Sequence, residues 1–376
     1  MRKYPIGIQN FRKVREGGYL YVDKTEIIHR LVTTGEYYFL SRPRRFGKSL
    51  MVDTLEELFS GSKELFEGLW IYDHWDWTKK NPVIHFNFAE IPYKEVGLQE
   101  ALKIELERNA KFAGVVLETA TLQGRFRELI EKVAQSKGPI ILLIDEYDKP
   151  LIDFLDVPIT VDENRSVLKS FYSVLKGQDK NIRLMLLTGV SRFSKVSLFS
   201  DLNQLSDITL VEEMNDLVGI TQKELETNFP EDLQELAEKF NKSVPEIYAQ
   251  VKKWYNGYSW GGANTLYNPF SLLSLFRWKQ FDNFWIHTGT PAFFSDMIRR
   301  NPGLKFPDGE VEAGPEALID LFNQKTEYDG QDSIRPITIM FQTGYLTVKH
   351  YDPALEVYTL DFPNREVKLS MELFLL

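Results

Sequence analysis

The apolar residues of the first 211 positions fall into short runs separated by amphipathic stretches. Glu36–Leu40 and Pro82–Phe88 are rich in β-forming residues, and continuous apolar runs follow at Pro139–Ile144 and Ile182–Leu187. Runs without polar positions are typical of strands that are buried on both faces of a sheet. Asp207–Val211 is the last short strand that the pattern predicts.

Helical periodicity occupies the stretches between these strands. Helices are predicted near residues 48–59, 97–112, 120–136 and 162–177. Strands that alternate with helices indicate a parallel sheet with right-handed crossovers. We therefore expect an α/β fold over residues 35–211.

The pattern changes after residue 212, where predicted helices follow one another. Thr221 and Glu224 form a capping box in front of a helix predicted over residues 222–239, and a second helix is predicted over residues 243–254. This part of the chain is therefore predicted to begin as a helical unit and not to continue the sheet.

Near the end of the chain the pattern alternates again. Gly344–His350 and Leu355–Leu360 predict the two strands of a β-hairpin. Helices followed by such a hairpin favour a winged-helix-like module. Because a single core rarely grows beyond about 250–300 residues, we divide the chain into two domains, residues 1–212 and residues 213–376.

Composition narrows the classes of protein to which the chain can belong. It has no cysteine, which excludes disulfides, thiolate zinc sites and cysteine nucleophiles. The N-terminus has no apolar signal segment, and no stretch reaches about 18 uninterrupted apolar residues, so neither secretion nor a membrane span is predicted. We expect a cytoplasmic protein.

Charge is distributed unevenly along the chain. The net charge is −9, yet residues 1–50 carry eleven Lys and Arg against four Asp and Glu, so the remainder carries −16. An acidic chain is a poor general binder of nucleic acid, because that affinity depends on neutralised phosphates. The basic cluster of Arg42, Arg44, Arg45 and Lys48 instead favours a compact polyanion such as a nucleotide. A solvated surface loop is the alternative interpretation.

This basic cluster lies in a segment with the order strand, loop and helix. A loop that enters a helix N-terminus directs backbone N–H groups and the helix dipole at one point, which suits a phosphate group. Gly47 would permit a close backbone approach, Lys48 would reach the β- and γ-phosphate oxygens, and Ser49 would ligate Mg2+. The predicted ATP-binding residues are Arg44, Arg45, Phe46, Gly47, Lys48, Ser49 and Leu50.

The loop departs from the usual P-loop at one position. The first glycine of that pattern stands five positions before the second, and Arg42 takes its place here. Pro43 stiffens the loop further. We expect a reshaped loop in which Arg44 or Arg45 supplies charge that backbone amides normally supply.

An acidic pair follows the most apolar strand. Asp145 and Glu146 come directly after Pro139–Ile144, and ligands of parallel sheets bind at the carboxyl ends of the strands. Asp145 is predicted to hold Mg2+ through water, and Glu146 to orient or deprotonate the attacking water. The alternative, an acidic pair that only caps the next helix, is disfavoured by the phosphate loop earlier in the chain.

The next apolar strand also ends in polar residues. Thr188 follows Ile182–Leu187 and is placed to sense the γ-phosphate. Arg192 is predicted to stabilise charge in the transition state, either within the chain or across a boundary between subunits. A basic surface loop without a catalytic role is the alternative.

Together these motifs resemble the AAA-ATPase-like family of bacterial P-loop proteins. Besides the phosphate loop, the resemblance is carried by Pro5–Phe11, Tyr21–Thr25, Asp145–Pro150, Thr188–Phe193 and Trp254–Tyr258. The side chains of Trp254–Tyr258 predict aromatic packing around a turn at Gly257. The alternative is a surface that stacks on a nucleotide base.

The resemblance implies an ATPase core that uses a nucleotide and Mg2+, and it implies that arginine at position 42 is a family feature. Members are usually fused to a C-terminal nuclease domain of the PD-(D/E)xK type, which we do not expect within this sequence. Asp352, Glu366 and Lys368 spell part of such a nuclease pattern. Pro363 interrupts the second segment, so we interpret that pattern as chance.

Several functions remain open from the sequence. The first is a Mg2+-dependent ATPase whose nucleotide state moves the helical and winged part against the α/β core. The second is a nucleotide-gated regulator that binds DNA or a partner protein through residues 213–376. A degenerate phosphate loop kept for structure is the third. A role for Arg192 across a subunit boundary would further require a homo-oligomer.

Overall fold

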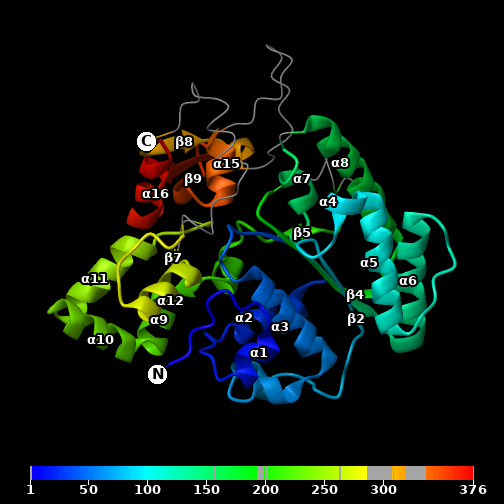
Figure 1. Cartoon of the computed structure of the whole chain (residues 1–376), viewed down its shortest axis with the longest axis horizontal. Helices are drawn as coiled ribbons and strands as arrows, with labels where there is room; N and C mark the ends of the chain where they lie inside the picture. Colours follow the sequence, from blue (N-terminus) through cyan, green and yellow to red (C-terminus); the bar gives the residue numbers. More distant parts are fainter. Residues whose placement is uncertain are drawn as a thin grey trace, which may run out of the picture.

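A five-stranded parallel sheet forms the centre of the computed structural model, which describes residues 2–155, 157–192, 199, 202–261, 264–285, 307, 309–318 and 336–375. The strand order is β2-β3-β4-β1-β5, and every neighbouring pair is parallel. The predicted parallel α/β fold is therefore confirmed (Figure 1). The strands are β1 (Tyr37–Ser41), β2 (Val83–Asn87), β3 (Ile140–Asp145), β4 (Ile182–Gly189) and β5 (Ser206–Asp207).

Helices connect and cover these strands. The predicted helices near 48–59, 97–112, 120–136 and 162–177 correspond to α3, α5, α6 and α8. The helices of this part are α1 (Phe11–Glu16), α2 (Thr25–Thr34), α3 (Lys48–Ser60), α4 (Tyr93–Val96), α5 (Leu98–Ala113), α6 (Leu122–Lys137), α7 (Lys149–Ile152) and α8 (Pro158–Ser173). Short 3-10 helices lie at η1 (Lys63–Phe66), η2 (Trp70–Asp73), η3 (Val174–Gly177), η4 (Glu212–Leu217) and η5 (Pro315–Leu318).

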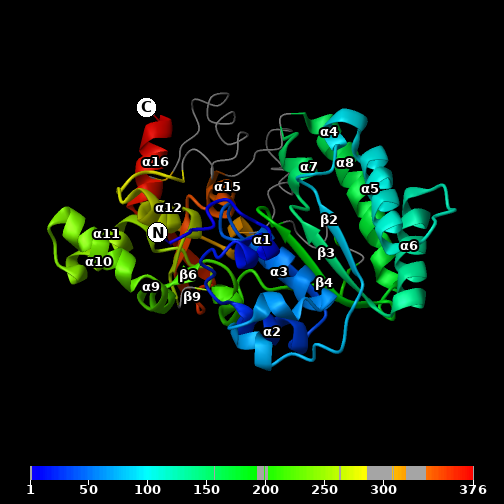
Figure 2. The same ribbon diagram turned by 60° about the horizontal axis from the view of Figure 1, so that its bottom comes forward.

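Alternate residues of the central strands face two different cores. Ile141 and Leu143 of β3 lie in a core shared with α1, α2 and α3, whereas Leu142 and Ile144 lie in a second core shared with α5, α6 and α8. Figure 2 shows these two groups of helices on opposite sides of the sheet. Because both faces are covered, the strands need no polar positions, which explains their continuous apolar runs.

The register of the strands brings their carboxyl ends to one edge of the sheet. Ser41 at the end of β1 pairs with Gly189 of β4, and Asn87 of β2 pairs with Asp145 of β3. The phosphate loop and the acidic pair therefore leave the sheet on the same side, where α/β proteins bind ligands.

In place of the predicted strand over Asp207–Val211, the structure has β5, which begins one residue earlier and ends at Asp207. The Asp207 side chain accepts a hydrogen bond from the backbone N–H of Thr209 (2.9 Å), an arrangement that turns the chain. Thr209 then uses its hydroxyl to accept the backbone N–H of Ser41 (3.0 Å). The strand ends because side chains, and not the backbone of a neighbouring strand, accept hydrogen bonds from these two N–H groups.

After the sheet, four helices surround a third core. The capping box of Thr221 and Glu224 is confirmed, but the helix predicted over 222–239 is two helices, because Pro230 starts a new one at its first position. Strands β6 (Ile220–Thr221) and β7 (Leu266–Tyr267) pair beside them. The helices are α9 (Gln222–Asn228), α10 (Pro230–Phe240), α11 (Val244–Tyr255) and α12 (Pro269–Trp278).

The last part of the described chain is a small antiparallel sheet. β9 (Thr347–Asp352) and β10 (Val357–Asp361) form the predicted hairpin, and β8 (Val311–Ala313) adds a third strand. Helices α15 (Pro336–Thr343) and α16 (Arg365–Leu375) flank it. The hairpin is thus confirmed, while the winged-helix assignment and the domain boundary after residue 212 stay predictions. None of the helices in the described part of the chain has the length and apolarity that a bilayer-spanning segment requires.

Candidate functional site

The phosphate loop leads from β1 into the N-terminus of α3. Gly47, which precedes the helix, has a backbone φ of 95°, and Arg45 has a φ of 70°. Both angles lie in the left-handed region, which glycine adopts freely and other residues rarely adopt. The first turn of α3 follows immediately, and its unsatisfied N–H groups are what an anion site at a helix N-terminus requires.

Lys48 is a buried cation of this loop. Its Nζ donates hydrogen bonds to the carbonyl oxygens of Arg42 (2.7 Å) and Pro43 (3.0 Å). Burial lowers the pKa of Lys48, and the carboxylates of Asp145 and Glu146 oppose that shift. Because both carboxylates act on the same ammonium group, the loop and the end of β3 lie close together.

Asp145 and Glu146 differ in their surroundings. Asp145 is buried and its Oδ1 accepts hydrogen bonds from the Thr188 hydroxyl and from the Glu146 N–H (3.1 Å). Glu146 has a φ of 53°, a left-handed conformation that costs a non-glycine residue about 1–3 kcal/mol and that clusters at functional sites. The structure therefore brings Thr188, Asp145 and Glu146 together, with Thr188 acting on the Asp145 carboxylate.

Asp148 is a further buried carboxylate, for which no role was predicted from the sequence. Its Oδ2 accepts the backbone N–H groups of Val190 (3.0 Å) and Ser191 (2.5 Å) after β4. Burial raises the pKa of Asp148 to about 6, although the hydrogen bond from Ser191 lowers it. Asp148 thus ties the segment after β3 to the segment after β4, and no local sequence signal marks a contact over that separation.

A cavity of about 460 Å³ lies in front of the loop. Arg44, Arg45, Lys48 and Lys149 line it against a single carboxylate, Glu146. This excess of positive charge suits the phosphates of a nucleotide. Other predicted residues that line it are Gly47, Ser49 and Leu50.

Two segments outside the predicted site close this cavity. Residues 5–9 line one side, and Pro269, Phe270 and Leu273 of α12 line another. The guanidinium carbon of Arg45 lies 5.1 Å from the centre of the Phe270 ring, a distance at which a cation is attracted to the ring face. A ligand in the cavity would therefore touch both the α/β core and the helical region.

A small apolar cavity of about 90 Å³ adjoins the first one. Both are lined by Pro5, Gly47, Leu50, Pro269 and Leu273. Phe46, the remaining predicted residue of the loop, lines only the apolar cavity. Apolar walls beside a charged cavity are what a nucleotide requires, because its base is flat and uncharged while its phosphates are anionic.

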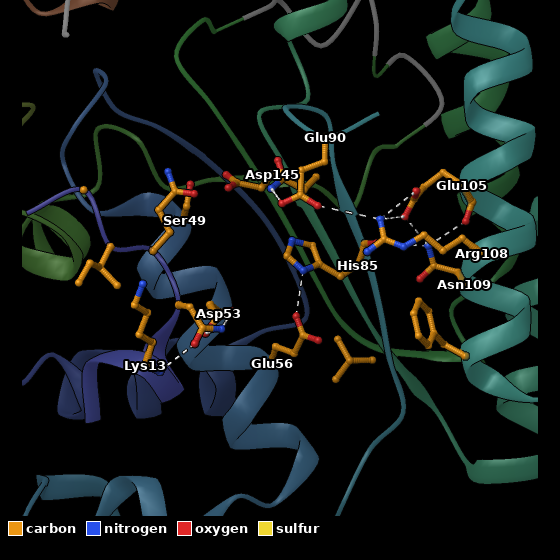
Figure 3. A pocket seen from close by; sticks show the side chains of 17 residues that line it. Lys13, Ser49, Asp53, Glu56, His85, Glu90, Glu105, Arg108, Asn109 and Asp145 are labelled. Carbon is orange, nitrogen blue, oxygen red and sulfur yellow. Dashed lines mark hydrogen bonds and ion pairs between the residues drawn. The ribbon is translucent and has the colours of Figure 1, made fainter. Parts of the chain in front are cut away.

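A larger groove of about 740 Å³ lies on the other side of Ser49 (Figure 3). Figure 3 shows Ser49, Asp53 and Glu56 on α3 facing His85 of β2, with residues of α5 beyond. Five carboxylates and two cations line the groove, so it disfavours phosphates. These charged residues are Asp53, Glu56, Glu90, Glu105, Asp145, Lys13 and Arg108.

Within the groove, Nδ1 of His85 forms a hydrogen bond with Oε2 of Glu56 (2.9 Å). Burial lowers the pKa of His85, but the hydrogen bond and charge of Glu56, with the charges of Asp145 and Asp53, raise it by more. His85 therefore favours the protonated form more than an ordinary histidine does.

Ser49 and Asp145 fit a metal that is held together with a nucleotide. Both line the groove, and they offer the hydroxyl and carboxylate oxygens that Mg2+ prefers. Mg2+ keeps several waters and takes substrate phosphates as ligands, so few protein ligands are needed. Among the described residues, no group of three or more His, Asp or Glu side chains could hold a metal ion.

Arg192 does not line the charged cavity and is paired with Asp207. Its Nε donates a hydrogen bond to Asp207 Oδ2 at 2.6 Å, and both side chains are largely buried. A salt bridge of this kind restrains the guanidinium, so the predicted action on a transition state would require Arg192 to leave Asp207. Most of the other predicted residues line the charged cavity, whereas Phe46 lines the adjoining apolar cavity, and Asp145, with Thr188 bonded to it, lies at the groove beyond Ser49.

The sequence matches a family of known proteins. The family model described as Predicted AAA-ATPase matches residues 5–199, which is more than half of the chain. The chain belongs to this AAA-ATPase-like family. Membership makes it a nucleotide-binding, ATPase-like protein, in agreement with the phosphate loop and the acidic pair that lie within the matched residues.

A relative supports the membership, and two solved structures are weakly similar. The relative, described as an uncharacterized protein in the vnfD 5' region of Azotobacter chroococcum mcd 1, is 39% identical over 375 residues, covering 98% of this chain and 69% of that protein. The Aeropyrum pernix ORC2 protein, solved in ADPNP-ADP complexes, is 11% identical with a TM-score of 0.36, covering 94% of this chain and 91% of that one. The Aeropyrum pernix ORC1 protein in complex with DNA is 12% identical with a TM-score of 0.32, covering 97% and 95%. Similarity at these TM-scores supports no inference about this chain.

Proposed function

We propose that this protein is a Mg2+-dependent ATPase that couples its nucleotide state to movement of a C-terminal effector region. One observation carries the proposal: the phosphate-loop lysine and Glu146, the second residue of the acidic pair, line one cavity with an excess of positive charge. Lys48 and Glu146 both line that cavity, and Asp145 influences the same lysine. A phosphate loop without function would need no such convergence.

The roles of the residues follow from their positions. Lys48 would exchange its bonds to the loop carbonyls for β- and γ-phosphate oxygens, and Ser49 with Asp145 would hold Mg2+. Bound Mg2+ would neutralise charge on the phosphates. Thr188 would orient the Asp145 carboxylate, and Glu146 would orient or deprotonate the attacking water.

The loop residues complete the binding site. Arg44 and Arg45 would contribute charge toward the phosphates, and Gly47 with the start of α3 would contribute N–H groups. Phe46 and Leu50 line the apolar cavity, which would take the base. The few polar groups around that cavity favour adenine, whose flat ring can be held by packing with few hydrogen bonds.

The lining of the cavity supports coupling to the effector region. Phe270 and Leu273 of α12 line the nucleotide cavity, so a bound nucleotide would contact residues on both sides of the predicted boundary. A ligand shifts an equilibrium only through different contacts in the two states. Contacts to α12 provide such a difference.

A second candidate function is a nucleotide-gated regulator with little hydrolysis, which would bind DNA or a partner protein through residues 213–376. The ion pair of Arg192 with Asp207 favours it, because the arginine is withheld from the cavity. Release of Arg192 by a partner, or by a second copy in a homo-oligomer, would then switch hydrolysis on.

Binding and hydrolysis can be tested separately with the purified chain. Saturable binding of ATP with Mg2+ is measured by calorimetry, and phosphate release is measured under the same conditions, for the wild type, Lys48→Ala and Glu146→Gln. The ATPase proposal requires binding and turnover in the wild type, with loss of binding in the first variant and loss of turnover in the second. Binding without turnover would leave the gated regulator, and no binding by the wild type would reject both.

A further inference from the structure

Arg42, which occupies the position of the first P-loop glycine, is fully buried behind the loop. Its Nη1 donates hydrogen bonds to the carbonyl oxygens of Ser41 (2.9 Å) and Thr209 (2.8 Å). The other guanidinium nitrogens, Nε and Nη2, are buried and have no hydrogen-bond partner among the described residues. Since none of the described carboxylates forms an ion pair with Arg42 either, other contacts support its guanidinium group.

That support comes from the helical region. The guanidinium carbon of Arg42 lies 4.2 Å from the centre of the Trp260 ring, and a desolvated cation over tryptophan is the strongest form of this contact. The rings of Trp260 and Tyr258 are stacked with their centres 6.2 Å apart. The Phe46 ring packs edge-on against Tyr258 (4.8 Å) and against Trp260 (5.1 Å). The Arg42 side chain and the Phe46 ring therefore fix the back of the loop to the segment that follows α11.

The front of the same loop faces the nucleotide cavity. The carbonyl oxygen of Arg42 accepts the hydrogen bond from Lys48 Nζ, and its backbone N–H donates to Gly189 at the end of β4 (3.2 Å). A single residue thus positions the phosphate-binding lysine through its backbone and holds Trp260 through its side chain. Glycine at position 42 would keep the first set of contacts and lose the second.

We propose that Arg42 is a positioning residue that shapes the phosphate loop by anchoring it to Trp260, so that restoring the usual glycine weakens nucleotide binding. The usual loop relies on glycine to form a nest of backbone N–H groups. Here the left-handed backbone angles lie at Arg45 and Gly47. Arg42 instead restricts the conformation of the loop through the contact of its side chain with Trp260. The anchor links loop shape to residues 256–261, and its effect on nucleotide affinity rests on the proposed function.

The test compares ATP-Mg2+ dissociation constants for Arg42→Gly, Trp260→Leu, their combination, and the conservative Trp260→Phe. We expect each of the first two to weaken binding by about tenfold or more, equal to about 1.4 kcal/mol. The double variant should be little worse than either single one, because both remove the same contact. Trp260→Phe retains a ring face and should bind nearly as the wild type does.

Arg183→Gly is a matched control. Arg183 also lies over aromatic rings, Phe59 (5.1 Å) and Trp75 (5.7 Å), but near the amino end of β4. A purely structural role for such arginines predicts equal losses of stability and no specific loss of affinity in either variant. The positioning role predicts that only the change at Arg42 weakens nucleotide binding.

Hydrogen exchange of the loop peptide in nucleotide-free protein separates this proposal from the proposed function. Faster exchange over residues 43–49 in Arg42→Gly, but not in Arg183→Gly, supports the anchor even if the wild type binds no nucleotide. Should Arg42→Gly fail to fold, Arg42→Met, which fills the space without a cation, and Trp260→Leu give the same comparison. Unchanged or tighter nucleotide binding in Arg42→Gly, or additive effects of the two single changes, would overturn the proposal.

Discussion

The Nζ atom of Lys48 donates a hydrogen bond of 2.7 Å to the carbonyl oxygen of Arg42. Carbonyl oxygens of the loop thus accept the hydrogen bonds of the Lys48 ammonium group. This group is buried, and burial lowers its pKa. A phosphate oxygen would replace a neutral carbonyl by a charged acceptor, which adds the attraction between opposite charges to the hydrogen bond. The loop is therefore poised to exchange its own carbonyls for a nucleotide.

Replacing Lys48 by alanine should remove most nucleotide binding. A hydrogen bond to a charged group contributes about 1.5–3 kcal/mol, so Lys48→Ala should weaken ATP-Mg2+ binding by about tenfold to a hundredfold or more in calorimetry. Lys349→Ala is the control, because Lys349 also donates to a backbone carbonyl, that of Pro363 (3.3 Å), but in the C-terminal sheet. Equal affinities of the two variants would contradict the role of Lys48.

Glu146→Gln should separate binding from hydrolysis. The amide keeps the size of the side chain but cannot accept a proton, and general-base catalysis contributes about 10²–10⁴-fold. We expect phosphate release to fall by that factor while ATP affinity changes by less than about threefold. Glu90→Gln, a change in the neighbouring groove, should leave both unaltered. A Glu146→Gln variant that hydrolyses ATP at the wild-type rate would remove this residue from the mechanism.

Much of the sheet and the front of the site could be predicted because their signals are local. The strand over Pro139–Ile144 has no polar interruption, and the phosphate loop adjoins its helix in sequence. Closure of the cavity by Phe270 and the contact of Arg42 with Trp260 join residues more than two hundred positions apart, so no window of sequence contains them. Asp148 was missed for the same reason, since its partners lie after the next strand.

The ion pair of Arg192 with Asp207 gives a test of the predicted transition-state role. Asp207→Asn should free the guanidinium and raise the rate of ATP hydrolysis a few-fold, whereas Arg192→Ala should lower it. Phosphate release measured at saturating ATP distinguishes the two changes from effects on binding. If both variants hydrolyse ATP as the wild type does, Arg192 only stabilises the chain around β5.

Asp148 should make stability depend on pH. Its pKa is raised from 3.8 to about 6 by burial, so between these values the folded state holds a proton that the unfolded state has lost. The free energy of unfolding contributed by this group is therefore highest below about pH 4 and falls as the pH rises to about 6, by about 3 kcal/mol in total.

Denaturant unfolding of the wild type and of Asp148→Asn isolates that contribution, since all other groups titrate in both proteins. The stability of the wild type relative to the variant should fall between about pH 4 and pH 6.5 and stay constant above that range. A difference that does not vary with pH would show that the Asp148 carboxyl titrates normally.

Gly344 connects the C-terminal part of the chain to the phosphate loop. A Cβ atom at this position would lie 2.8 Å from Cβ and Cγ of Pro43, and its backbone φ is 91°. Gly344→Ala should therefore displace Pro43, whose carbonyl oxygen accepts a hydrogen bond from Lys48. We expect ATP-Mg2+ affinity to fall several-fold in a binding titration, beyond the loss of about 1 kcal/mol of stability that a left-handed alanine brings.

Gly114→Ala separates the two effects of that change. Gly114 has a φ of 74°, and none of the described atoms lies within 4 Å of the added Cβ, so alanine there carries a similar backbone penalty without a collision. Both variants should melt at lower temperature, but only Gly344→Ala should bind nucleotide less tightly. Equal nucleotide affinities would mean that Pro43 moves aside without disturbing Lys48, and that the C-terminal part does not act on the site through this contact.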